Sequence, residues 1–234
     1  MATPRRLRMP DDFIPIAEAS GLIVPLGAWV LEEACRQAAA WTASGLDLHM
    51  AVNLSARQVT HPTTLATIEG ALYLSGLPAG RLLVEVTESA VMEDAEAAMV
   101  ALTRIAELGA SIAIDDFGTG YSSLLYLKRY PIRALKVDRS FVAGMGENDD
   151  DVAIVTSVVT LARAVGAVSI AEGVETREQH VALLAMGCDF GQGYLYGRPV
   201  AATQLPAALP SCESLLESYA SDMWCAIGQP PTLA

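Results

Sequence analysis

The sequence predicts an α/β fold in which parallel strands alternate with helices around a barrel. From about Leu48 onward, short β-branched or aliphatic runs alternate with longer stretches whose apolar residues recur every three or four positions. Glycines stand between several of the helical stretches and the next apolar run, as helix C-caps favour. Repeated βα units of this kind are typical of a sheet of parallel strands covered by helices.

Six runs are predicted as strands, at residues 48–53, 81–86, 111–115, 133–138, 167–171 and 188–190. Helices are predicted upstream of them and between them, at residues 29–41, 62–75, 93–108, 122–130, 150–165 and 177–186. A TIM-like (β/α)8 barrel uses eight strands in about 250 residues. The pattern fades after Pro199, so we expect a barrel of this type that lacks its first strands.

The length and composition favour one large domain. The chain has 234 residues, of which 52% are hydrophobic, so it can bury a sizeable core. We assign residues 1–200 to the barrel domain, incomplete at its N-terminus. Residues 201–234 form a C-terminal extension, predicted to be helical at 214–224 and then flexible.

The charge and the apolar pattern exclude several classes of partner. A formal net charge of −12 disfavours binding to a nucleic-acid polymer or an anionic membrane surface. The apolar run at 154–161 is interrupted by Thr156, Ser157 and Thr160, too short and too polar to span a bilayer. No secretory signal is recognisable, and the four cysteines are too widely spaced for a zinc or redox motif. We therefore expect free thiols and a cytoplasmic location.

Polar side chains stand at the end of every predicted strand but the last, and just after the last one. They are Asn53, Glu85, Asp115, Asp116, Lys136, Asp138, Glu172 and Gln192. Because functional residues of βα barrels gather where strands end, these groups should converge on one rim. So many carboxylates repel one another unless cations neutralise them, and oxygen ligands select hard divalent ions such as Mg²⁺, Mn²⁺ or Ca²⁺.

Plainer interpretations stay open at each position. A single acid at a strand end is more often a helix N-cap or a solvated loop residue, and only the recurrence of acids favours a site. Lys136 lies between apolar neighbours, so its ammonium needs either a carboxylate partner in an ordinary ion pair or a phosphate. The Asp-Phe-Gly at 116–118 is not that of a kinase, because no His-Arg-Asp motif exists in the chain.

The motifs, taken together in order, resemble those of the EAL-type cyclic di-GMP phosphodiesterases. The matching segments are Phe-Ile-Pro at 13–15, Asn-Leu-Ser at 53–55, Glu-Val-Thr-Glu at 85–88, DDFGTGYSSL at 115–124, LKVD at 135–138, AEGVET at 171–176 and Gln-Gly-Tyr at 192–194. The similarity runs from about Asp11 to Val200. It implies a (β/α)8 barrel that opens cyclic di-GMP to linear pGpG with two divalent cations, Mg²⁺ or Mn²⁺.

The resemblance also implies a role for individual residues. Metal ligands would be Asn53, Glu85, Asp115 and Glu172, with Asp116 on the second metal. Lys136 would contact the attacking water, Glu175 would support the metal–water network, and Glu88 would hold the loop after Asp116 in place. Gln192, Asp138 and Gly118 would contact the substrate. The loop after Asp116 would also form a homodimer contact.

The sequence departs from the family pattern in one respect. The Glu-Ala-Leu triplet that names the family, with the Arg that follows it, is expected before residues 1–12 and is missing. A start codon placed too late, a longer multidomain protein and a degenerate protein each explain this. Three functions therefore stay open: a phosphodiesterase, an inactive module that binds cyclic di-GMP or a protein, and an inert fragment.

Overall fold

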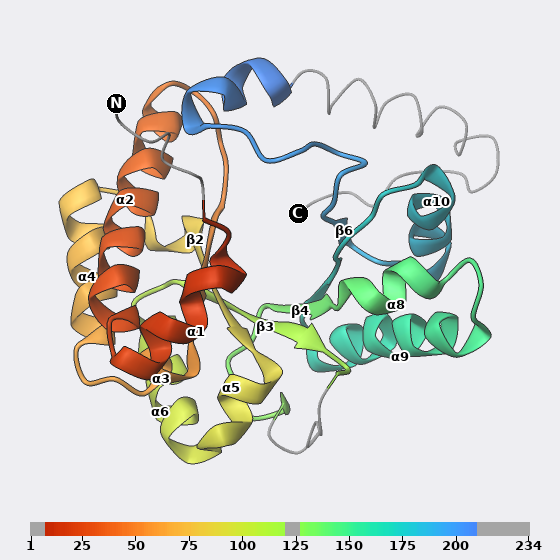
Figure 1. The fold of residues 1–234 in the computed structure, drawn as a ribbon, viewed down its shortest axis with the longest axis horizontal. Coiled ribbons are helices and arrows are strands. Elements are labelled where there is room, and N and C mark those ends of the chain that lie inside the picture. Colours follow the sequence, from red (N-terminus) through yellow and green to blue (C-terminus); the bar gives the residue numbers. More distant parts are fainter. Residues whose placement is uncertain (1–7, 120–126, 210–234) are drawn as a thin grey trace, which may run out of the picture.

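The computed structural model describes residues 8–119 and 127–209, and its centre is a curled sheet of six parallel strands (Figure 1). The strands are β1 (Met50–Leu54), β2 (Leu82–Thr87), β3 (Ser111–Phe117), β4 (Ala134–Val137), β5 (Val168–Ala171) and β6 (Phe190–Gly191). They pair in chain order, each beside the next along the sequence. The six predicted strands and the α/β barrel class are thus confirmed, and the described residues supply six of the eight strands of a TIM-like barrel.

Helices lie around the outside of the curled sheet in the view of Figure 1. They are α1 (Pro10–Ser20), α2 (Ile23–Ala43), α3 (Ala56–Val59), α4 (Thr64–Ser75), α5 (Glu88–Glu93), α6 (Ala95–Glu107), α8 (Arg139–Gly144), α9 (Asp149–Val165) and α10 (Arg177–Met186). Helix α2 packs along α4, and α9 packs on β4 and β5. None of the helices in the described part of the chain is long and apolar enough to cross a bilayer.

The helices differ from the predicted ones in places that have physical causes. Helix α10 has its predicted bounds, and α6 matches the helix predicted at 93–108 but begins at Ala95, where the Asp94 side chain caps it through the Ala97 amide. Helix α5, which ends just before Asp94, was not predicted. Helix α1 was not predicted because Pro15 stands inside it, where proline normally breaks a helix. The helix predicted at 122–130 lies mostly, and that at 214–224 wholly, outside the described residues, and only 201–209 of the extension is described.

The core lies between the sheet and the helices. On β2, Leu82, Val84 and Val86 are fully buried, and their alternation with Glu85 shows that they share the helix-facing side of the sheet. Ile112 on β3 is a partner of Val84 in register and belongs to the same layer. The apolar side of each strand is therefore used for packing, which leaves the opposite side free to carry polar groups.

We predict that Ile112→Ala lowers the free energy of unfolding by about 2–5 kcal/mol, because it removes a fully buried side chain from the middle of this layer. Urea unfolding followed by circular dichroism measures the loss. The control is Val100→Ala in α6, where the side chain is 61% exposed and the change should stay within about 0.5 kcal/mol. Equal midpoints for the two variants would contradict this assignment of the core.

Candidate functional site

Strand register places the predicted rim residues on one side of the sheet. Asn53 on β1 is the register partner of Glu85 on β2, and Glu85 is the partner of Ala113 on β3. Asp115 follows Ala113 by two residues, so it points to the same side, one step nearer the carboxyl end. The side chains at these strand ends therefore face away from the helix layer, toward the inside of the curled sheet.

The same alternation continues across the other strands. Lys136 on β4 is the register partner of Ile170 on β5, and Ile170 is the partner of Phe190 on β6. Glu172 and Gln192 stand two residues beyond Ile170 and Phe190, just after the ends of their strands. Parallel pairing thus brings one polar residue from each of six strands to the carboxyl edge of the sheet.

An irregularity in β3 gives this edge a second acid. Ile114 pairs with Leu135 and Phe117 pairs with Val137, so two residues of β3, Asp115 and Asp116, stand opposite a single residue of β4. This is a β-bulge. Asp116 has φ +53°, the one positive φ of a non-glycine residue in the described ranges. Regular alternation would send consecutive side chains to opposite faces, and the bulge instead keeps both carboxylates near the same edge.

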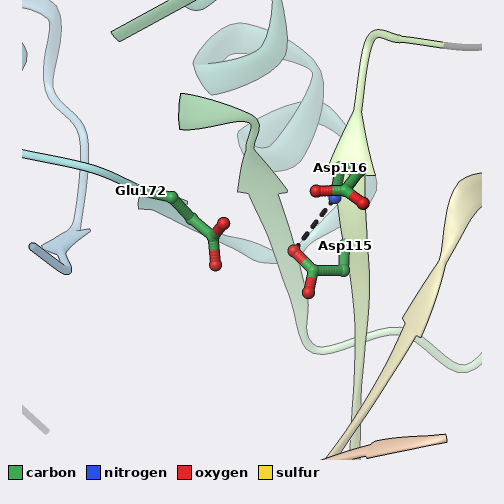
Figure 2. A group of neighbouring side chains, drawn as sticks. All are labelled: Asp115, Asp116 and Glu172. Atoms are coloured by element: carbon green, nitrogen blue, oxygen red, sulfur yellow. Dashed lines mark hydrogen bonds between the residues drawn. The ribbon is translucent and has the colours of Figure 1, made fainter. Parts of the chain in front are cut away.

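Figure 2 shows the resulting group of acids, with Asp115 and Asp116 on β3 and Glu172 reaching toward them from the segment after β5. One carboxylate oxygen from each of these three residues lies within 4.8 Å of the others. The amide of Asp116 donates a hydrogen bond of 2.9 Å to Asp115 Oδ1, which fixes the turn of the bulge.

Lys136 lies at the centre of the site. Its side chain is 2% exposed, and Nζ donates to Glu85 Oε2 at 2.8 Å, contacts Asp115 Oδ2 at 3.0 Å and forms a third, short ion pair with Glu172 Oε1. Asn53 Nδ2 donates to the same Glu85 oxygen at 3.3 Å. One ammonium therefore ties together groups from β2, β3 and the segment after β5.

The charges in the site alter its titration. Burial alone would lower the pKa of Lys136, but its hydrogen bonds to Glu172 and Glu85 and the charges of Glu85 and Asp115 raise it above the ordinary value. Burial raises the pKa of Glu172, and Lys136 offsets this only in part. Lys136 is thus held in its charged form across the neutral range.

Asp138 enters the site through Asp116. Burial, together with the charges of Asp115 and Asp138 and a hydrogen bond with Asp138, raises the pKa of Asp116. Burial would also raise the pKa of Asp138, but hydrogen bonds from Ser140 and Asp116 bring it below the ordinary value. Within this pair, the surroundings therefore favour protonation of Asp116 over protonation of Asp138. Asp138 also begins α8 by accepting from the Ser140 amide at 3.0 Å.

Glu88 is buried beside the loop that follows the acids. Its Oε2 accepts a hydrogen bond of 3.1 Å from the Gly118 amide. Gly118 has φ +101°, a conformation that a residue with a side chain rarely adopts, and a Cβ there would lie 3.2 Å from the Phe141 ring. The start of the loop is thus held in place, while residues 120–126 are outside the described ranges.

Two predicted site residues are less firmly placed. Gln192 is exposed, and its backbone amide donates to Ala171 O, at the end of β5, at 2.8 Å. Glu175 is also exposed, and its amide donates to Gln179 Oε1 at 2.8 Å. Within the described ranges, neither side chain forms a hydrogen bond or an ion pair with the acids. The link between Asp116 and Asp138 was not predicted, although the Lys-x-Asp spacing at 136–138 puts both side chains on one face.

The donor set fits hard divalent cations. Four carboxylates, those of Glu85, Asp115, Asp116 and Glu172, face one ammonium, which leaves a deficit of three positive charges when all are ionised. With Asn53, the available ligand atoms are all oxygens apart from the amide nitrogen, and no thiolate or imidazole belongs to the set. Oxygen donors of this kind select Mg²⁺, Mn²⁺ or Ca²⁺ over zinc.

Comparison with known proteins gives one consistent family. A family model described as the EAL domain matches residues 2–199. The chain is 48% identical over 201 residues to the bifunctional diguanylate cyclase/cyclic di-GMP phosphodiesterase MucR of Pseudomonas aeruginosa, covering 86% of this chain and 29% of MucR. It is 40% identical over 198 residues to the cyclic di-GMP phosphodiesterase PdeR of Escherichia coli, covering 85% of this chain and 30% of PdeR. The chain therefore spans less than a third of the length of either relative.

Solved structures agree with the sequence matches. The phosphodiesterase part of MucR, in a complex with cyclic di-GMP, superposes with a TM-score of 0.84 at 47% identity, over 87% of this chain and 83% of that one. The EAL domain of DcpA from Mycobacterium smegmatis superposes with a TM-score of 0.74 at 40% identity, over 80% of this chain and 84% of that one.

We predict that Lys136→Met destabilises the fold by about 3–5 kcal/mol at pH 7, because it leaves three carboxylates without their shared cation. A lysine whose pKa is raised on folding stabilises the folded state at every pH below its unfolded value of about 10.4. That contribution is lost only as the pH rises through the higher folded value.

Urea unfolding in chelator between pH 5 and pH 9 tests this. The wild-type contribution should stay level over the range, and the deficit of the variant should shrink toward acid pH as its carboxylates take up protons. Lys128→Met removes an exposed lysine and serves as the control. A variant as stable as this control at pH 7 would show that the ion pairs carry no weight in folding.

A second prediction concerns divalent cations. Asp116→Asn should weaken binding of Mn²⁺ by about 10-fold or more, because it removes one of three clustered carboxylates. Calorimetric titration with MnCl₂ measures the dissociation constant. Asp150→Asn, in the exposed first turn of α9, removes the same charge far from the cluster in sequence and should leave the constant unchanged. Similar losses in the two variants would indicate general charge attraction instead of a defined site.

Proposed function

The chain belongs to the EAL domain family, and from this membership we propose that it hydrolyses cyclic di-GMP to linear pGpG with the help of divalent cations. The observation that carries the proposal is the buried ammonium of Lys136 within a ring of carboxylates that retains a charge deficit. The names of MucR and PdeR, and the complex of MucR with cyclic di-GMP, support the choice of substrate.

The proposed ligand roles follow from the placement of the side chains. Asn53, Glu85, Asp115 and Glu172 would hold one cation, and Asp116 would bring in a second through the bulge. The two cations are proposed to be Mg²⁺ or Mn²⁺, since both ions take carboxylate oxygens as ligands and can lie close together in a two-metal site. When bound, they supply a polarised water and neutralise charge on the phosphodiester.

The protein groups position the reacting atoms. Lys136 keeps its positive charge, so it orients the attacking water and offsets negative charge without accepting a proton. The water oxygen forms a bond to phosphorus while the bond from phosphorus to O3′ breaks, and this gives a linear dinucleotide with a 5′-phosphate. A carboxylate oxygen of the cluster takes one proton of the water and passes it to the departing O3′, which leaves as a hydroxyl group. Glu88 and the Gly118 amide hold the loop after the acids against this site.

Other roles stay predictions. We propose that Gln192, Asp138 and Gly118 contact the substrate and that Glu175 supports the water network, as the family resemblance implies. A homodimer through the loop after Asp116 and a cytoplasmic location are likewise proposed, as is the division into residues 1–200 and 201–234.

A second function, binding without turnover, is favoured by one observation. The carboxylate ring is already bridged by Lys136, and the Gly118 loop and the Gln192 segment lie beside it for contact with a ligand. Such a protein would bind cyclic di-GMP and leave it intact.

Incubation with cyclic di-GMP and Mg²⁺ or Mn²⁺, followed by chromatography, separates the two functions. We predict that linear pGpG appears and that Glu85→Gln lowers its rate of formation by about 100-fold or more, as expected for a metal ligand. Glu69→Gln, an exposed glutamate on α4, is the control and should keep the wild-type rate. A folded wild-type protein that binds cyclic di-GMP without producing pGpG would support the binding function and refute hydrolysis.

A further inference from the structure

We propose that Tyr194, fixed by Arg198, is a stacking platform for a guanine base of the ligand at the carboxylate site. The inference rests on the proposed function, because it takes the ligand to be cyclic di-GMP. Tyr194 is two residues beyond Gln192, in the segment that follows β6 at the carboxyl edge of the sheet.

The backbone holds this segment against the one that carries Glu172. The Val174 amide donates to Gln192 O at 3.0 Å, and the Leu195 amide donates to Val174 O at 3.0 Å. Between these two bonds, Gly193 lies so close that a Cβ on it would be 2.2 Å from Val174 O. Tyr194 therefore stands on a short loop fixed to the chain only two residues beyond Glu172.

The two tyrosines of this loop have different surroundings. Tyr196 packs over Gly191, and its hydroxyl forms a hydrogen bond of 2.9 Å with His180 Nδ1. Tyr194 is 51% exposed, and the contact that the structure records for its ring is with the Arg198 guanidinium, 4.5 Å from the ring centroid. One face of the ring is thus braced by a cation, and half of the side chain stays open to solvent.

This arrangement suits a nucleobase. Aromatic rings that bind bases offer a fixed face on which the base stacks, and a neighbouring arginine adds a cation–π contribution. Bracing by Arg198 limits the freedom that the ring would lose on binding, so less of the stacking free energy is offset. The carboxylate site would take the phosphodiester, and a base on the same nucleotide would extend toward the rim, where Tyr194 stands.

Exposure alone does not distinguish Tyr194, since Tyr73 on α4 is 86% exposed. What distinguishes it is the arginine over the ring and the fixed loop beside Glu172. Tyr73 therefore supplies a matched control, because Tyr73→Ala removes the same exposed side chain from a helix on another part of the molecule.

The test is calorimetric binding of cyclic di-GMP to the full chain in chelator, where the proposed hydrolysis does not proceed. We predict that Tyr194→Ala raises Kd by about 5- to 100-fold, the range expected for one lost base stack. Tyr194→Phe should stay within about 2-fold, because the ring is kept, and Arg198→Ala should raise Kd by about 2- to 5-fold. Tyr73→Ala should leave Kd unchanged, and all four variants should unfold at the wild-type temperature.

A second pair of probes isolates the base. GMP and ribose 5-phosphate differ only in the guanine, so Tyr194→Ala should weaken GMP binding and leave ribose 5-phosphate binding unchanged. Wild-type affinity for cyclic di-GMP in Tyr194→Ala would overturn the platform, as would equal losses for GMP and ribose 5-phosphate. Failure of the wild type to bind cyclic di-GMP would overturn it together with the proposed function. Binding without pGpG formation would refute hydrolysis alone and leave the platform standing.

Discussion

The site depends on the burial of one positive charge. The ammonium of Lys136 could not be tolerated at 2% exposure without partners, and it finds them on two strands and one loop. Because Glu85, Asp115 and Glu172 are far apart in the sequence, their meeting requires the parallel register of β2 to β5. The same contacts that satisfy Lys136 also keep the carboxylates close together, so the charges of Asp115 and Glu85 add to burial in raising the pKa of Glu172.

The sheet makes this convergence possible with ordinary strand geometry. Alternate residues of each strand belong either to the apolar layer under the helices or to the polar edge. Val84 and Glu85 are therefore neighbours in the chain, but Val84 packs in the core and Glu85 belongs to the site. Only at Asp115 and Asp116 does the alternation fail, and there a bulge and a left-handed residue put two acids where one would stand. Strain of this kind persists where the surrounding structure fixes it, here through the Asp115 hydrogen bond and the Glu88 contact with Gly118.

The strands and most of the rim residues could be predicted from the sequence because both follow simple periodicities. The alternation of apolar runs gave all six strands, and reading the residue at each strand end gave Glu85, Lys136 and Glu172. The bulge could not be predicted, because two adjacent acids in a strand normally point in opposite directions. Helix α1 was missed because Pro15 argues locally against a helix that tertiary contacts with α2 sustain. The brace of Arg198 over Tyr194 depends on the path of a loop that no periodicity describes.

The position of Lys136 has a consequence for whether folding or binding of metal ions comes first. An acidic ring that relied wholly on metal ions for neutrality would oppose folding whenever those ions were scarce. A permanent cation built into β4 lowers that opposition, so the chain can reach its native structure first and acquire ions afterwards. The proposed cations can then bind after folding, and their loss does not require the protein to unfold.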